Sequence, residues 1–201
     1  MKRKYLILFF VLIFILFLGL YLSDNINLLD DSLFNLIFNL RSNLMTNIMK
    51  FITFFASTKF ITIIFIVLLI LYFINKKRIF LITDIIIIGE VVLNNIVKIL
   101  VGRERPKLEH LVTENSFSFP SGHTMVAVVF YGFIIYLINK STIDKKIKII
   151  SNIIFIILII LIMISRIYLG VHFPSDVLSG ASLSLAYLIY MIELLEKRDI
   201  L

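Results

Sequence analysis

The sequence predicts an all-α integral membrane protein, a bundle of six transmembrane helices with one short amphipathic helix at the membrane interface. Of its 201 residues, 60% are hydrophobic and only 16% are charged, and the mean hydropathy is +1.04. Soluble domains contain about 45–50% apolar and about 25% charged residues. A span needs roughly 20 apolar residues, so this length suits about six spans with short connections. We therefore expect one domain over residues 1–201.

Six apolar runs are long enough to cross a bilayer. The first follows the basic residues at 2–4; it is longer than the apolar region of most signal peptides and has no small-residue cleavage site after it, so we expect it to be retained. The expected spans are residues 5–22, 51–74, 79–100, 120–138, 149–165 and 174–195.

The segment between the first two spans, residues 24–50, is too polar to cross the membrane. In a helix capped by Asp30, Asp31 or Ser32, six aliphatic residues would share one face, opposite a face of Asn and Arg side chains. These aliphatic residues are Leu33, Leu36, Ile37, Leu40, Leu44 and Ile48. We expect an amphipathic helix lying at the interface, with a packed loop as the alternative.

The basic residues indicate the orientation, because Lys and Arg gather on the cytoplasmic side of membrane proteins. With the N-terminus inside, the cytoplasmic segments are 1–4, 75–78, 139–148 and 196–201, which carry more than half of the 20 Lys and Arg residues. Both chain ends are then cytoplasmic, and the charged loops after the third and fifth spans face outside. Topology thus accounts for the net charge of +7, and no nucleic-acid partner is implied. The chain has no Cys, which excludes disulfides and thiolate chemistry.

Three stretches on the outer side carry side chains suited to an anion. In the first, Lys98 and Arg105 are seven residues apart, so two helical turns would place them on one side, about 10 Å apart along the axis. Pro106 disfavours helix at Arg105, which lets the guanidinium turn inward. Taken alone, both cations have an ordinary alternative as interfacial residues that reach lipid headgroups.

The second stretch, residues 118–124, opens the fourth span. Pro120 suits the first turn of a helix because its missing N–H group would have no partner there. The free N–H groups of Ser121, Gly122 and His123 then point out of the positive end of the helix dipole, which makes an anion cradle. For His123 taken alone, the alternative is a capping or interfacial histidine.

The third stretch lies between the last two spans and contains Ser165, Arg166, His172 and Asp176. Arg166 suits bidentate binding of phosphate oxygens. We expect Asp176 to accept a hydrogen bond from one ring nitrogen of His172, which leaves the other nitrogen free as a nucleophile or base. Together the three stretches predict a site that binds a ligand with several negative charges and reacts with it.

The patterns Lys-x6-Arg-Pro, Pro-Ser-Gly-His and Ser-Arg-x5-His-x3-Asp, in this order, resemble the three signature motifs of the type 2 phosphatidic acid phosphatase family. That family shares its catalytic core with vanadium haloperoxidases. Every motif position is matched between Lys98 and Asp176. The region around residues 116–123 is also similar to small bacterial members that act on phosphatidylglycerophosphate or undecaprenyl pyrophosphate.

The resemblance implies a metal-independent lipid phosphatase without a cofactor, working through a phosphohistidine at the outer face of the bacterial cytoplasmic membrane. His172 would attack phosphorus, Asp176 would orient it, and His123 would protonate the leaving oxygen. The implied phosphate-binding residues are Lys98, Arg105, Ser121, Gly122 and Arg166. The substrate would be of the phosphatidylglycerol phosphate, undecaprenyl pyrophosphate or phosphatidic acid class.

Two other functions fit the sequence: a lipid-linked phosphotransferase, which passes the phosphoryl group to an acceptor other than water, and a transporter. The transporter depends on Asp84 and Glu90, which lie within the third span and must face protein or a cavity. A packing role is favoured for both over a proton path. We expect Glu104 to balance or tune Arg105, and His110 to face solvent or headgroups.

Overall fold

The computed structural model describes residues 2–107 and 109–198, and within these ranges the chain forms eight α-helices and no strand. They are α1 (Lys2–Leu22), α2 (Asn27–Phe38), α3 (Asn43–Phe54), α4 (Thr58–Asn75), α5 (Arg78–Val101), α6 (Gly122–Lys140), α7 (Lys145–Tyr168) and α8 (Pro174–Lys197). Six helical stretches are long and apolar enough to span a membrane, α3 and α4 together forming one of them. The predicted fold class is confirmed, and the chain is an integral membrane protein. Residues 199–201 of the predicted cytoplasmic tail lie outside the described residues.

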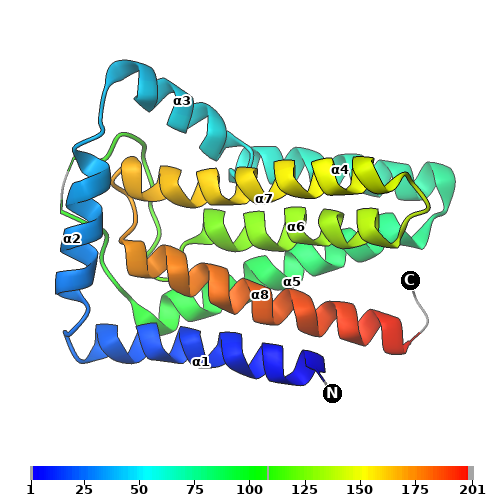
Figure 1. The fold of residues 1–201 in the computed structure, drawn as a ribbon, viewed down its shortest axis with the longest axis horizontal. Helices are drawn as coiled ribbons and strands as arrows, with labels where there is room; N and C mark the ends of the chain where they lie inside the picture. The colour runs from blue at the N-terminus through cyan, green and yellow to red at the C-terminus, as the bar shows by residue number, and fades with distance from the viewer. Residues whose placement is uncertain (1, 108, 199–201) are drawn as a thin grey trace.

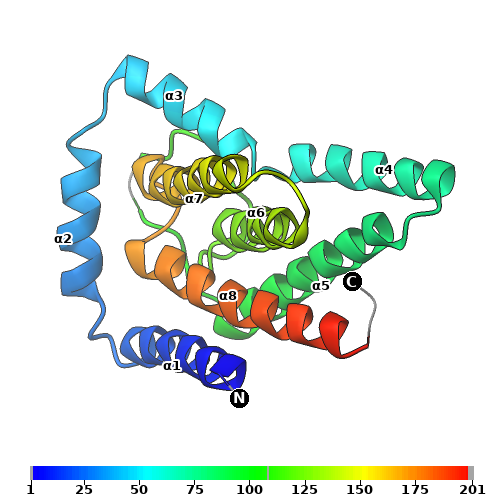
Figure 2. The ribbon, with the colours of Figure 1, turned by 45° about the vertical axis from the view of Figure 1, so that its right-hand side comes forward.

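The long helices run side by side, and α2 crosses one end of the bundle (Figures 1 and 2). Helix α6 lies between α7 and α8, α1 packs along α8, and α4 packs against α5. The C-terminal ends of α5 and α7 and the N-terminal ends of α6 and α8 all lie at the end that α2 crosses (Figure 1). The loops that carry the three sequence motifs are therefore gathered there.

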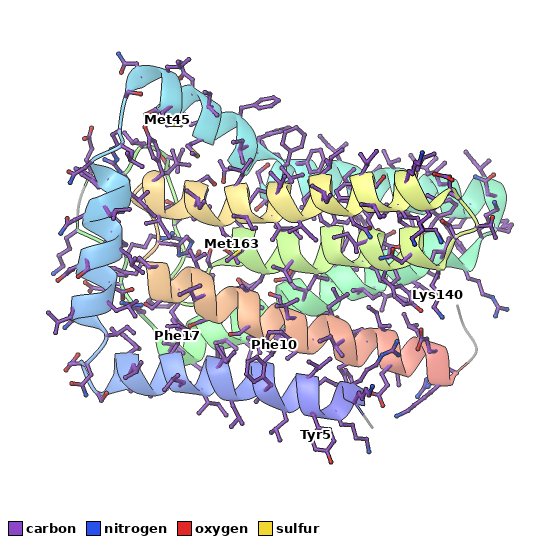
Figure 3. All side chains as sticks on the ribbon, viewed as in Figure 1. Tyr5, Phe10, Phe17, Met45, Lys140 and Met163 are labelled. Carbon is purple, nitrogen blue, oxygen red and sulfur yellow. The ribbon has the colours of Figure 1, made fainter. Side chains whose placement is uncertain are left out.

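Helix α6 forms the centre of the bundle. Its residues 124–131 are all buried, and its side chains pack against α5 and α8 on one side and α4 and α7 on the other. The outer helices instead expose apolar side chains, as expected of surfaces that contact lipid. Tyr5 of α1 points away from the bundle, whereas Phe10 lies between α1 and α8 (Figure 3).

The amphipathic segment differs from its prediction, because it forms two helices instead of one. Helix α2 ends at Phe38. Helix α3 begins at Asn43, where the Ser42 hydroxyl caps it by accepting a hydrogen bond from the Met45 N–H group, at 3.3 Å. Five residues of the predicted apolar face are exposed, with Leu36 at 66% and Leu44 at 73%, whereas Ile37 packs against the core. That exposure fits helices whose apolar side faces the bilayer interface.

The second and fifth spans also differ from their predicted bounds. The second span contains a break, because α3 ends at Phe54 and the Ser57 hydroxyl caps α4 by accepting a hydrogen bond from the Phe60 N–H group, at 3.3 Å. The fifth span continues to Tyr168, three residues beyond its predicted end. Arg166 therefore lies in the last turn of a helix, where its side chain is held more firmly than in a loop.

Candidate active site

Residues from all three stretches meet at the end of the bundle that α2 crosses. A cavity of about 450 Å³ opens there between α4, α5 and α6. Five of the predicted site residues line it: Lys98, Arg105, Gly122, His123 and His172. The other three lie behind its wall and are at most 1% exposed: Ser121, Arg166 and Asp176.

His172 is held on both sides of its ring. Its Nδ1 atom lies 3.3 Å from the Ser118 hydroxyl, which in turn donates a hydrogen bond of 2.5 Å to Oδ2 of Asp176. The direct distance from Nδ1 to that oxygen is 3.6 Å, longer than an ordinary N–H···O hydrogen bond. Ser118 therefore bridges the predicted pair of His172 and Asp176, a residue that the motif pattern did not single out.

Arg105 fixes the protonation of the other ring nitrogen. Its guanidinium lies 3.3 Å from Nε2 of His172 and donates to the Val171 carbonyl oxygen at 2.7 Å. A guanidinium has no acceptor atom, so Nε2 must accept and the proton must be on Nδ1. Burial, together with the positive charges of Arg105, Arg166 and Lys98, lowers the pKa of His172 well below its ordinary value. The ring is therefore neutral at pH 7, and Nε2 carries a lone pair instead of a proton.

The structure contradicts the expected helical spacing of Lys98 and Arg105 but agrees with the expected inward turn of Arg105. Helix α5 ends at Val101, and Gly102 follows with a φ of +63°, so Lys98 and Arg105 are not two turns apart on one helix. Arg105 lies in the loop and turns inward, as the neighbouring Pro106 suggested. Lys98 remains in the last turn of α5 and donates a hydrogen bond to the Phe117 carbonyl oxygen.

The start of α6 supplies fewer free amides than expected. The Ser121 N–H group donates to the Asp176 carbonyl oxygen at 3.1 Å, and its hydroxyl accepts from Thr124 at 3.1 Å. The expectation that the Ser121 N–H group is free is therefore wrong. Gly122 and His123 remain as the first two residues of the helix, where N–H groups have no intrahelical acceptor.

Glu114 is a site residue that sequence reasoning missed. Its carboxylate forms an ion pair with Arg166, and its oxygens lie 3.7 Å from a guanidinium nitrogen of Arg105 and 3.8 Å from Nδ1 of His123. The Arg166 guanidinium also donates to the Thr53 hydroxyl at 2.7 Å. A carboxylate and a phosphate attract the same donors, so Glu114 lies where an anionic ligand would meet these cations.

Arg103 and Asp30 were also not predicted as site residues, and they are linked to Asp176. Arg103 donates to Oδ1 of Asp176 at 2.6 Å and to Oδ2 of Asp30 at 2.7 Å. Asp30 was expected to cap a surface helix, but it lies inside α2 and reaches into the protein. Arg103 is 73 residues from each of these carboxylates, so no local sequence pattern could have indicated the contacts.

The remaining polar residues have less direct connections to the site. Glu104 is exposed, and its one ion-pair contact among the described residues is Lys107, at 3.9 Å, so it does not pair with Arg105. A ring nitrogen of His110 lies 2.7 Å from the Pro106 carbonyl oxygen. Asp84 and Glu90 are buried, with carboxyl oxygens that have no hydrogen-bond partner among residues 2–107 and 109–198; Glu90 also lines the cavity.

The positive charge of the site comes from Lys98, Arg105 and Arg166. In the described parts of the chain, no group of three or more His, Asp or Glu residues is arranged to hold a metal ion. The arrangement combines a neutral, oriented imidazole, a second imidazole and several cations around one cavity. Such a set of groups suits nucleophilic attack on a phosphoryl group.

Comparison with known proteins gives a consistent result. Residues 79–200 match the family model described as the PAP2 superfamily. The sequence is 46% identical over 98 residues to phosphatidylglycerophosphatase B of Bacillus subtilis (strain 168). That alignment spans 46% of this chain and 46% of the relative, so the sequence match extends over less than half the length of this curated protein.

Two solved structures are similar over most of the chain. The transmembrane PAP2-type phosphatidylglycerolphosphate phosphatase of Bacillus subtilis matches with a TM-score of 0.84 and 30% identity, covering 98% of this chain and 96% of the other. LpxE of Aquifex aeolicus matches with a TM-score of 0.64 and 27% identity, covering 82% of this chain and 95% of the other.

Proposed function

The chain belongs to the PAP2 superfamily, and from this premise we propose that it is a membrane lipid phosphatase that removes a terminal phosphate from a lipid phosphate or pyrophosphate. The observation that carries the proposal is the state of His172. Its neutral ring is bridged to Asp176 on one side and directs Nε2 toward Arg105 in a cavity lined by cations.

The walls of the cavity support a substrate with a lipid tail. Away from the histidines it is lined by side chains of α4 and α5, including Phe65, Ile88 and Val92. Ile88 and Val92 are about half exposed on α5, one of the helices that are long and apolar enough to span a membrane. An acyl or isoprenoid chain can lie against this apolar part while its phosphate reaches His172.

The first half of the reaction transfers the phosphoryl group to the enzyme. The lone pair on Nε2 of His172 forms a P–N bond while the bond from phosphorus to the lipid oxygen breaks. His123 donates a proton to that oxygen as it leaves, a contribution typically worth about 10² to 10⁴ in rate. When the substrate binds, the Arg105 guanidinium has to leave Nε2 of His172 and donate to a phosphate oxygen instead.

The second half releases inorganic phosphate. Water attacks phosphorus and gives a proton to His123, while the electrons of the P–N bond return to Nε2. Lys98, Arg105 and Arg166, with the amides at the start of α6, stabilise the charge on the phosphoryl oxygens in both transition states. Because Glu114 lies against Arg166 and Arg105, the phosphate has to displace its carboxylate.

The proposed substrate class follows from the relatives named above, because the curated relative and the first solved structure, both from Bacillus subtilis, are described as a phosphatase of phosphatidylglycerophosphate. We propose phosphatidylglycerol phosphate first, with undecaprenyl pyrophosphate and phosphatidic acid as the other members of the class. We further propose that both chain ends are cytoplasmic and that the site faces outward, because Lys and Arg favour the opposite end of the bundle.

The test is phosphate release by the purified protein in detergent from phosphatidylglycerol phosphate, undecaprenyl pyrophosphate and phosphatidic acid. We expect release from at least one of them, abolished by His172→Ala. His110→Ala is the matched control, since His110 is exposed and lies outside the cavity, and it should retain wild-type activity. A His172→Ala protein with full activity would refute the mechanism, and phosphate appearing on a lipid acceptor instead of in solution would indicate a phosphotransferase.

A further inference from the structure

Buried charges connect the surface helix α2 with the histidine that reacts. Asp30 of α2 lies 2.7 Å from one guanidinium nitrogen of Arg103, and Asp176 lies 2.6 Å from another. All three side chains are at most 4% exposed, so solvent screens these charges little. Neither Asp30 nor Arg103 lines the cavity that contains the two histidines.

We propose that Asp30 and Arg103 are positioning residues, which set the orientation and the effective charge of Asp176 and through it the reactivity of His172. The proposal rests on the phosphatase function proposed above. Since neither side chain reaches the cavity, both act on the reaction through Asp176.

The orientation of Asp176 depends on Arg103 because each carboxylate oxygen has its own partners. Oδ1 accepts from Arg103, while Oδ2 accepts from the Ser118 hydroxyl at 2.5 Å and from the Phe173 N–H group at 2.9 Å. Fixing both oxygens fixes the plane of the carboxylate. Oδ2 is thereby held toward Ser118, the residue that bridges it to His172.

Arg103 is itself fixed from several directions. Its guanidinium lies over two aromatic rings, 4.7 Å from the centroid of Tyr21 and 4.1 Å from that of Phe173. Such stacking favours a guanidinium over a more flexible ammonium group. Asp30 completes the arrangement from α2, so the guanidinium can contact both carboxylates at once.

Asp30 also determines the charge that His172 experiences. One guanidinium shared by two carboxylates leaves the group with a net negative charge. If Asp30 were neutral, Arg103 would compensate Asp176 fully, and Asp176 would stabilise less of the positive charge that develops on His172 as the P–N bond forms. Because Lys98, Arg105 and Arg166 already oppose that charge, the remaining negative charge is needed at Asp176.

A purely structural role for Asp30 predicts different behaviour. Asp30 also accepts hydrogen bonds from the Ser175 N–H group at 2.8 Å and from its hydroxyl at 2.7 Å, which ties α2 to the first turn of α8. Asp30→Asn keeps the shape of the side chain and one acceptor oxygen for Ser175, but removes the charge. A control has to leave Ser175 in place, because its hydroxyl also accepts a hydrogen bond from Arg103 at 2.7 Å.

The experiment measures kcat and KM for phosphate release, with thermal unfolding of each variant in detergent. We expect Asp30→Asn and Arg103→Lys to lower kcat roughly 10- to 100-fold, by analogy with the loss caused by replacing a residue that orients a metal ligand, with KM within about twofold. Asp30→Glu should recover part of the loss because it restores the charge. The matched control is Asp31→Asn, which removes the same charge from an exposed neighbour and should keep kcat within about twofold.

The proposal is overturned if folded Asp30→Asn keeps wild-type kcat, or if Asp31→Asn lowers kcat as much as Asp30→Asn does. If Asp30→Asn does not fold, Arg103→Lys, which keeps the buried positive charge, decides the question, and wild-type kcat in that variant overturns the proposal. A wild-type protein that releases no phosphate, or a His172→Ala protein that still does, would instead contradict the phosphatase function.

Discussion

The two histidines of the cavity are held in different ways. His172 is 1% exposed, with Arg105 on one side of its ring and Ser118 and Asp176 on the other. His123 is partly exposed, and among the described residues its one ion-pair contact is Glu114, at 3.8 Å. A nucleophile must be aligned and unprotonated before the substrate arrives, whereas an acid can be aligned by the oxygen that it protonates. The difference therefore agrees with His172 as nucleophile and His123 as acid.

The largest expected effect comes from replacing the two histidines, and it distinguishes the acid from the nucleophile. His123→Gln should lower phosphate release from alkyl lipid phosphates by about 10² to 10⁴, but far less for an aryl phosphate such as p-nitrophenyl phosphate, whose leaving group needs no proton. His172→Ala should abolish both reactions. Comparing kcat/KM for the two esters in each variant is the measurement. Equal losses for both esters in His123→Gln would contradict its role as an acid.

A smaller effect is expected at the bridge between His172 and Asp176. Ser118→Ala removes the two hydrogen bonds that the Ser118 hydroxyl makes with His172 and Asp176. At roughly 1 kcal/mol net for each, kcat should fall roughly 5- to 30-fold. Ser179→Ala is the matched control, because the Ser179 hydroxyl is also buried but has no hydrogen-bond partner in the described part of the chain. Unchanged kcat in Ser118→Ala would mean that His172 and Asp176 interact directly once substrate is bound.

The smallest expected effect is that of mild acid on His172. Burial and neighbouring cations lower its pKa well below 6.5, and only the neutral ring can attack, so the loss of activity caused by protonating His172 should begin well below pH 6.5. The measurement is kcat/KM against pH, with the titration of the substrate phosphate followed separately by ³¹P NMR. A loss centred near pH 6.5 that the substrate does not explain would contradict this environment for His172.

The sequence predicted best those features that depend on motif residues and their immediate neighbours in the chain. The motif residues Lys98, Arg105, His123 and His172 all line one cavity, and Pro106 correctly indicated that Arg105 leaves the helix. The sequence misplaced contacts that depend on distant segments. Ser121 was expected to present a free amide, but that amide binds the Asp176 carbonyl oxygen.

The residues that sequence reasoning missed share one property, since each contacts the site across a long sequence separation. Ser118 reaches Asp176 across 58 residues, and Glu114 reaches Arg166 across 52. Ser118 lies only two residues before the second motif, which was a usable signal. Asp30 had no such signal, because an acidic residue near the start of a surface helix is common.

The sequence by itself determined the membrane bundle, its approximate spans and the residue types of the site, because hydrophobic periodicity, proline positions and motif spacing act over a few turns of chain. The tertiary structure decided which charges meet. Asp30, Arg103 and Asp176 are paired because α2 crosses the end of the bundle where α5 ends and α8 begins (Figure 1). Coulomb attraction depends on distance in space, and that distance is set by how the helices pack.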